Sequence, residues 1–203
     1  MRGRFIVVEG IDGSGKSTLA ARLAEDLALR GRRVLRTREP GGTRIGERVR
    51  GLLLNADHSE MVPLTEFFLF MASRAQLVEQ VIRPALRRGM DVVCDRYYYS
   101  TAAYQGAAGG VGIPGVLHIA EKVARFERPD VVALLDLPPA TARARRSGPG
   151  DRVERKGLVY QKRVRQGFLS IARRERRRFR VIDAARPVEE VFRDLRKAVD
   201  RAL

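Results

Sequence analysis

The chain has 203 residues, 44% of them hydrophobic, and its 40 lysine and arginine residues against 24 acidic residues give a formal charge of +16. This length is enough for one domain with a full core, with or without a small lid. No apolar run approaches the ~20 residues that cross a bilayer, and the basic first residues lead directly into an apolar run, so we expect neither a membrane span nor a signal peptide.

Predicted strands and helices alternate along the chain. Short apolar runs predict five strands, at residues 5–8, 33–38, 91–94, 131–135 and 179–182. Apolar residues at helical spacing predict helices at 16–30, 44–54, 64–88, 116–126, 141–146, 159–177 and 187–203, with one more after the third strand. We expect Pro84 to kink the helix over 64–88, and residues 106–115 to form a glycine-rich stretch between two helices. Continuous apolar strands alternating with helices indicate an α/β fold, a parallel sheet covered on both faces, in a single domain over 1–203.

A phosphate-binding loop joins the first predicted strand to the first helix. Residues 10–17 read GIDGSGKS and match G-x-x-x-x-G-K-[ST] in the strand–loop–helix context that the pattern requires. Glycines let backbone N–H groups approach phosphate oxygens closely, and the helix N-terminus adds the positive end of its dipole. Lys16 supplies a charge for the β- and γ-phosphates, and Ser17 a hydroxyl for Mg²⁺. We therefore predict a nucleoside triphosphate site formed by Gly10, Ile11, Asp12, Gly13, Ser14, Gly15, Lys16, Ser17 and Thr18.

The positive charge by itself allows two interpretations, nucleic-acid binding or a site for small polyanions. The run at residues 173–178 is the best candidate for a nucleic-acid contact. However, aromatic residues do not interleave with basic ones as in RNA-binding sheets, and no helix-turn-helix or zinc pattern occurs. We do not expect nucleic acid as a partner. The single cysteine, Cys94, excludes an internal disulfide and fits a small core residue of a cytoplasmic protein.

Charged residues follow several predicted strands. They lie at the carboxyl ends of these strands, which is where parallel α/β sheets bind their ligands. The residues at these ends are Glu9, Arg38, Glu39, Asp95, Arg96 and Asp136. Carboxylates and arginines repeated at one edge, beside a phosphate loop, favour a site that handles anions and a metal ion.

Four motifs together resemble bacterial thymidylate kinase over nearly the whole chain. They are Arg38-Glu39-Pro40-Gly41-Gly42-Thr43, Phe70-Met71-Ala72-Ser73-Arg74, Asp95-Arg96-Tyr97 and Ala103-Tyr104-Gln105-Gly106, in the family's order. The phosphate loop alone indicates only a P-loop NTPase, whereas this set is far more specific. The resemblance implies transfer of the γ-phosphate of ATP to dTMP, with Mg²⁺, on a five-stranded parallel sheet of order 2-3-1-4-5. It also implies a homodimer and a mobile lid.

The resemblance also implies a role for each matching residue. Phe70 is expected to stack on thymine, Arg74 to bond its O4 edge, and Tyr104 to pack against the deoxyribose where a 2′-hydroxyl would collide. The full set expected to bind dTMP is Glu39, Arg38, Arg50, Phe70, Arg74, Arg96, Ser100, Thr101, Tyr104 and Gln105. The expected metal ligands, direct or through water, are Ser17, Glu9, Asp12 and Asp95.

Phosphoryl transfer needs positive charge at the transferred group. Because no variable position of the phosphate loop is basic, the sequence resembles the branch of the family that carries its arginines in the lid, here at about residues 143–157. The expected catalytic residues are Lys16, Asp95, Arg96, Arg145 and Arg152, with Arg143 and Arg146 as nearby alternatives whose register is open. Two other functions stay open on the sequence: another small P-loop nucleotide or nucleoside kinase, and a nucleic-acid-binding ATPase that charge alone supports.

Overall fold

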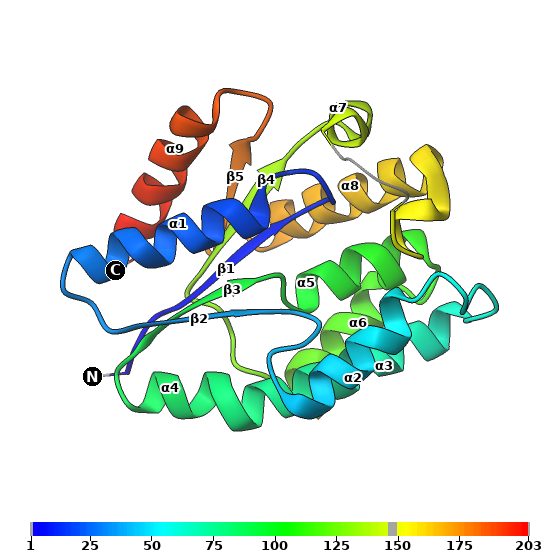
Figure 1. Ribbon diagram of the computed structural model, residues 1–203, viewed down its shortest axis with the longest axis horizontal. Helices are drawn as coiled ribbons and strands as arrows, with labels where there is room; N and C mark the ends of the chain where they lie inside the picture. Colours follow the sequence, from blue (N-terminus) through cyan, green and yellow to red (C-terminus); the bar gives the residue numbers. More distant parts are fainter. Residues whose placement is uncertain (1, 146–149, 203) are drawn as a thin grey trace.

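Five parallel strands form one sheet in the order β2-β3-β1-β4-β5 (Figure 1). The structure is a computed structural model that describes residues 2–145 and 150–202. The strands are β1 (Phe5–Gly10), β2 (Val34–Arg38), β3 (Asp91–Asp95), β4 (Val131–Asp136) and β5 (Phe179–Asp183). β1 lies in the centre and pairs with β3 on one side and β4 on the other. The predicted α/β fold and strand order are confirmed.

The central strands are buried on both faces, which explains their continuous apolar sequences. All six residues of β1 and the first four of β3 are buried. Val7 lies opposite Cys94 on β3 and Val132 on β4, so the middle of the sheet is a layer of small and branched side chains. Cys94 is a buried free thiol in this layer, as expected of a core cysteine.

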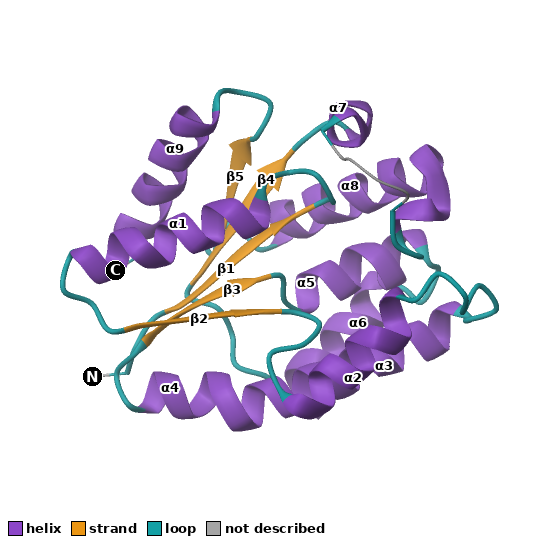
Figure 2. Ribbon diagram, viewed as in Figure 1, coloured by secondary structure: helices purple, strands orange, loops and turns teal. Residues whose placement is uncertain are grey.

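Helices cover both faces of this sheet (Figure 2). One face carries α1 (Lys16–Leu29), which packs on β1, β2 and β3, and α9 (Val188–Asp200), which packs on β4 and β5. The other face carries α4 (Arg83–Arg87), α5 (Tyr98–Thr101) and α8 (Gly157–Arg174). Farther out lie α2 (Arg44–Leu54), α3 (Pro63–Leu77) and α6 (Ile113–His118), while α7 (Pro139–Ala144) follows β4.

Several helices continue as short non-α segments. These are η1 (Val78–Ile82), η2 (Ala102–Ala108) and η3 (Ile119–Val123), which are π-helical, and the 3₁₀ turn η4 (Glu154–Lys156). The predicted helix over 64–88 is α3, η1 and α4 in succession, and the π segment comes just before Pro84, whose missing N–H and ring disturb a regular α-helical ladder.

Some predicted boundaries are wrong. The helix after β3 does not stop before the glycine-rich stretch at 106–115: it runs through Gly106 to Ala108, and α6 already begins at Ile113. The reason is packing, because a Cβ on Gly106 would lie 3.2 Å from the backbone of Ile113, so the glycine lets the two helices approach. α8 spans Gly157–Arg174 rather than 159–177, and the end of the predicted helix at Arg146 lies outside the described residues.

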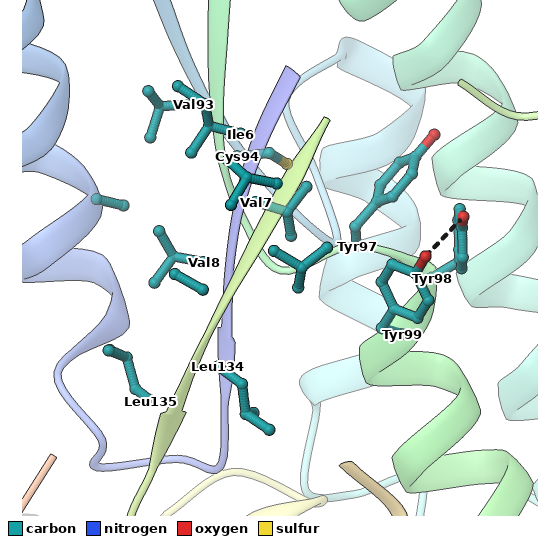
Figure 3. Close-up of a cluster of buried hydrophobic side chains, with 14 of the residues drawn as sticks. Ile6, Val7, Val8, Val93, Cys94, Tyr97, Tyr98, Tyr99, Leu134 and Leu135 are labelled. Atoms are coloured by element: carbon teal, nitrogen blue, oxygen red, sulfur yellow. Dashed lines mark hydrogen bonds between the residues drawn. The ribbon is translucent and has the colours of Figure 1, made fainter. Parts of the chain in front are cut away.

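Three consecutive tyrosines fill the space between the sheet and the helices opposite α1 (Figure 3). Tyr97, Tyr98 and Tyr99 are each at most 1% exposed. The Tyr97 ring meets Phe5 of β1 edge-on at 4.9 Å, and the Tyr98 hydroxyl lies 3.2 Å from that of Tyr99. This aromatic layer fixes the start of α5, and therefore the position of the segment that continues into η2.

Gly167 brings α8 against η2 at very short range. A Cβ on Gly167 would lie 2.7 Å from the Cβ of Ala107 and 3.2 Å from the Cα of Ala103, both on η2. Neither neighbour is a flexible side chain that could turn away. The absence of a side chain at residue 167 therefore sets the distance between α8 and the segment that carries Tyr104 and Gln105.

Replacing Gly167 by Ala should destabilise the protein although alanine favours a helix. Overpacking costs about 1–3 kcal/mol, whereas the gain in helix propensity is about 1 kcal/mol, so we expect a net loss of up to about 2 kcal/mol. Gly51 in α2 has no atom within 4 Å of its ideal Cβ, so Gly51→Ala is the matched control and should stabilise slightly. Urea unfolding measures both, and a Gly167→Ala variant as stable as the parent would contradict the close packing.

Candidate active site

Glycines shape the loop between β1 and α1. Gly10, Gly13 and Gly15 all have positive φ, at 148°, 83° and 88°. A Cβ on Gly10 would lie 2.7 Å from the carbonyl oxygen of Leu135 on β4, so the close approach of the loop to β4 requires glycine there. The chain thus turns into α1 through a glycine-rich loop at a helix N-terminus, the kind of loop whose backbone N–H groups bind phosphates.

Lys16 folds back over this loop. Its Nζ donates to the carbonyl of Ile11 at 2.8 Å, and the residue is only 6% exposed. Burial, with Arg96 nearby, lowers the pKa of Lys16 to about 8. The hydroxyl oxygen of Ser14 is buried in the same loop with no partner. A buried ammonium and an unpaired hydroxyl in one loop favour the binding of an anion.

Ser17 and Asp95 meet where the loop faces the end of β3. The Ser17 hydroxyl donates to Oδ2 of Asp95 at 2.5 Å, while Oδ1 of Asp95 is buried without a partner. A hydroxyl and a carboxylate with an unused oxygen are hard oxygen donors of the kind that Mg²⁺ prefers. Of the four expected metal ligands, the structure brings these two together.

Glu9, the third expected metal ligand, uses its carboxylate to hold the chain after β3. Its Oε1 accepts the N–H groups of Tyr97 and Ser100 at 2.8 and 3.1 Å, and its Oε2 accepts the Ser100 hydroxyl at 2.6 Å. Glu9 is fully buried, and this burial raises its pKa above the ordinary value. Both oxygens of Glu9 therefore serve to shape the turn that presents Arg96.

Arg96 connects the phosphate loop to the helix beyond β3. Its backbone has a φ of 72°, in the left-handed region. Its Nη1 donates to the carbonyl of Gly10 at 3.1 Å and to the Ser100 hydroxyl at 3.0 Å, and Nη2 pairs with Asp12. The Tyr104 hydroxyl donates to the other oxygen of Asp12 at 2.9 Å. Burial would raise the pKa of Asp12, but Arg96 and Lys16 hold it at about 2, so Asp12 is a fixed anion.

A pocket of about 110 Å³ lies next to Arg96. Its lining comes from the phosphate loop, the ends of β2 and β3, helices α2, α3 and α5, η2 and the segment before α8. The lining residues are Asp12, Glu39, Pro40, Arg50, Leu54, Phe70, Arg96, Ser100, Thr101, Tyr104, Gln105, Asp151 and Val153. Eight of the ten residues expected to bind the acceptor are among them.

Arg74, expected at the pocket, lies behind its wall. The guanidinium is 1% exposed; Nε donates to Oε2 of Glu39 at 2.7 Å and Nη2 to the Thr101 hydroxyl at 3.1 Å. Oε1 of Glu39 is buried without a partner. Arg74 therefore holds two pocket-lining side chains, Glu39 and Thr101, in a buried network.

Arg38, the other expected residue outside the pocket, lies at the metal-ligand side of the site. It is exposed, 3.5 Å from Glu47, and lines a groove together with Ser17 and Asp95. Arg50, in contrast, is half-buried in the pocket beside Arg96 and donates to the carbonyl of Pro40 at 3.0 Å.

The expected lid arginines have specific partners. Arg145 donates to the carbonyls of Ala184 and Ala185, after β5, at 2.8 and 3.3 Å. Arg152 is buried; its Nη1 donates to Glu66 at 2.7 Å, and its Nη2 has no partner. Arg146 lies outside the described residues.

Sequence reasoning missed several residues of the site. Leu54, Asp151 and Val153 line the pocket although no motif marks them, and Glu66 on α3 is fully buried beneath it. Only the charge of Glu66 within an apolar helical stripe could have signalled its role. Over residues 2–145 and 150–202, no helix is long and apolar enough to cross a membrane, and no three acidic, histidine or cysteine side chains gather as a metal site.

Comparison with known proteins gives one answer. The family model described as thymidylate kinase matches residues 8–195. The chain is 48% identical to the thymidylate kinase of Pelotomaculum thermopropionicum, with 100% of this chain and 95% of that protein covered. It is also 48% identical to that of Deinococcus radiodurans, with 98% and 97% covered. A crystal structure of thymidylate kinase from Ehrlichia chaffeensis is similar with a TM-score of 0.80 and 31% identity, covering 98% of this chain and 99% of that one.

Replacing Arg74 by Met should leave the Glu39 carboxylate buried without its counter-charge. We expect a loss of about 3–5 kcal/mol in the free energy of unfolding at pH 8. Burial, opposed by Arg74, already raises the pKa of Glu39 to about 7, above that of the unfolded chain, so the fold favours the neutral form and the penalty fades as the pH falls below 7. Urea unfolding should therefore show a smaller loss at pH 5.

The double variant Glu39→Gln/Arg74→Met serves as control, since it removes both charges and should recover much of the stability at pH 8. Equal losses at pH 8 and pH 5, with no recovery in the double variant, would mean that Arg74 acts through packing alone.

Proposed function

The chain belongs to the thymidylate kinase family and transfers the γ-phosphate of ATP to dTMP, and we propose that ATP binds the phosphate loop while dTMP binds the pocket beside Arg96. The observation that carries this assignment is the contact between the two: Arg96 lines the pocket and bonds Gly10 and Asp12 of the loop. A phosphate placed at Arg96 lies next to a triphosphate held by Lys16, as direct transfer requires.

In this arrangement the acceptor phosphate binds Arg96 and Arg50, whose guanidinium groups can form paired hydrogen bonds with it. Phe70 and Tyr104 supply aromatic surface for the thymine and deoxyribose. Thr101, Gln105 and, through the buried network, Arg74 lie at the base end. The support for this orientation is that Arg50 and Arg96 line the same pocket as Phe70 and Gln105.

The transfer itself depends mainly on positioning and on charge stabilisation, because the protein performs little covalent chemistry on a phosphoryl group. Lys16 places a cation on the β- and γ-phosphates, and Arg96 is held by Asp12 between donor and acceptor. We assign Glu9 to positioning, since its oxygens are occupied by Tyr97 and Ser100. Arg38, exposed at the groove with Ser17 and Asp95, lies on the donor side of the site.

We further propose that Mg²⁺ is held by Ser17 and Asp95, directly or through water. An ion held there would supply positive charge to the β- and γ-phosphates. The unpartnered Oδ1 of Asp95, beside the Ser17 hydroxyl, supports this choice. Asp12 is committed to Arg96 and Tyr104, so we place it in the scaffold of the acceptor pocket.

A lid over about residues 143–157 supplies further positive charge in this proposal. Residues 146–149 of it lie outside the described part of the chain. Arg152 has one nitrogen without a partner, and Arg145 lies against the loop after β5. Either can serve the transferred phosphoryl group, since the phosphate loop offers no cation besides Lys16.

We also propose that the protein is a homodimer and that it acts in the cytoplasm, with ATP as the donor. Ile45 and Leu52 on α2 and Leu64 and Phe68 on α3 are each between 47% and 56% exposed. Ile45 and Leu52 are seven residues apart, and Leu64 and Phe68 are four apart, so each pair lies on one face of its helix. The two helices, α2 and α3, pack on each other. An exposed apolar surface of this kind is typical of a subunit interface.

Shortening Tyr104 to alanine should relax the selection of deoxyribose. We expect activity on UMP relative to dTMP to rise by about tenfold or more, because removing an obstructing ring opens space for a 2′-hydroxyl. Tyr104→Phe is the matched control: it keeps the ring but loses the hydrogen bond to Asp12, so it should not gain UMP activity. The activity on each acceptor is measured by chromatography of the products formed from dTMP, dUMP, UMP and dCMP with ATP and Mg²⁺. An unchanged ratio in Tyr104→Ala would remove Tyr104 from sugar selection, and a failure of dTMP as the preferred acceptor would overturn the function.

Alanine substitution of the lid arginines should lower kcat. Supplying an arginine to a transferred phosphoryl group is worth about 10³–10⁵ in kcat in other enzymes. We expect at least one of Arg145→Ala, Arg146→Ala and Arg152→Ala to lower kcat more than ~100-fold, with a smaller effect on the KM for ATP. Steady-state kinetics decides: if all three variants keep more than about half of the parent kcat, the charge comes from elsewhere.

A further inference from the structure

Glu66 on α3 is a fully buried carboxylate that four hydrogen bonds hold from three side chains. Its Oε1 accepts from Nε2 of Gln105 at 2.5 Å and from Nζ of Lys156 at 3.1 Å. Its Oε2 accepts from Nζ of Lys156 at 2.8 Å and from Nη1 of Arg152 at 2.7 Å. Glu66 does not line the acceptor pocket itself, so these bonds are its role in the structure.

The three donors come from two walls of the acceptor pocket. Gln105 belongs to η2 and lines the pocket. Arg152 and Lys156 belong to the segment before α8, in which Asp151 and Val153 also line the pocket. A single carboxylate beneath the pocket therefore joins its base-binding wall to the wall formed by residues 151–153.

The same segment is also fixed to α2. The Nε of Arg152 donates to the carbonyl of Leu53 at 2.9 Å. The backbone N–H of Arg152 donates to the carbonyl of Leu54 at 3.4 Å. These carbonyls end α2, where they have no partner within the helix. Arg152 is thus held between the end of α2 and Glu66 on α3, which leaves only its Nη2 without a partner.

The charges make this arrangement depend on Glu66. Two cations, Arg152 and Lys156, face one carboxylate, and Arg152 is 7% exposed. Despite burial, Lys156 and Arg152 hold the pKa of Glu66 below its ordinary value, so it is ionised at neutral pH. Without that charge, the two cations repel each other, and a buried guanidinium lacks its counter-ion. The segment would then move toward water and take Asp151 and Val153 away from the pocket.

We propose that Glu66 is a positioning residue for phosphoryl transfer: it holds Gln105 and the segment at 151–156 in one arrangement, so that the acceptor pocket and Arg152 are set together. The inference rests on the proposed acceptor pocket. A merely structural Glu66 would lower stability and leave the kinetic constants of the folded enzyme unchanged, whereas a positioning residue changes the KM for dTMP separately from that for ATP.

The test compares Glu66→Gln with Glu79→Gln, a glutamate exposed on η1 and paired with Arg83. The loss of charge-assisted hydrogen bonds predicts a KM for dTMP about 10- to 100-fold higher in Glu66→Gln and a lower kcat, with the KM for ATP within about twofold. Amide hydrogen exchange of residues 150–157 should become faster, and dTMP should protect them less than in the parent. Glu79→Gln should match the parent in every measurement.

A second pair of variants keeps the test valid if Glu66→Gln folds poorly. Lys156 is partly exposed, so Lys156→Met should fold, and it should raise the KM for dTMP and the exchange of 150–157 in the same direction. Lys156→Arg keeps the charge, so its KM for dTMP and its hydrogen exchange at residues 150–157 should match those of the parent. Unchanged exchange and KM in Glu66→Gln and Lys156→Met, while Tyr104→Ala alters dTMP kinetics, would overturn the role of Glu66. If Tyr104→Ala also leaves dTMP kinetics unchanged, the pocket assignment fails, and this inference with it.

Discussion

The parallel pairing of β1 with β3 is the constraint on which the rest of the site depends. It places the phosphate loop, which follows β1, beside the Asp95-Arg96-Tyr97 turn, which follows β3. Arg96 can then bond Gly10 and Asp12 on one side and Ser100 on the other. In the proposed arrangement the donor and acceptor sites share this one guanidinium, so strand pairing sets their separation.

Acidic groups hold three of the arginines that the proposed reaction uses. Asp12 holds Arg96, Glu39 holds Arg74, and Glu66 holds Arg152. An arginine whose direction is fixed by a carboxylate behind it needs no rearrangement when a phosphate arrives, and such preorganisation is what makes charge effective in catalysis. A small number of carboxylates thus orients arginines at and around the pocket.

The fold and the donor loop could be predicted because local sequence determines them. Continuous apolar runs and the GIDGSGKS loop depend on residues next to each other in the chain. The acceptor pocket was predictable mainly through family motifs, and those could not separate side chains that line it from side chains behind it, as with Arg74. Glu66 was not found because its partners, Gln105 and Arg152, are 39 and 86 residues away. The helix through Gly106 was missed for a similar reason, since only its packing against Ile113 explains the glycine there.

The left-handed backbone of Arg96 has a consequence for how this protein can change. A non-glycine residue in this region carries a conformational cost of the order of 1–3 kcal/mol, which glycine would not. Replacing Arg96 by glycine would remove this cost, but it would also remove the guanidinium that bonds the phosphate loop and lines the pocket. Mutational drift toward greater stability and selection for turnover therefore act in opposite directions at this position, and a lineage that loses its need for the reaction should lose this arginine early.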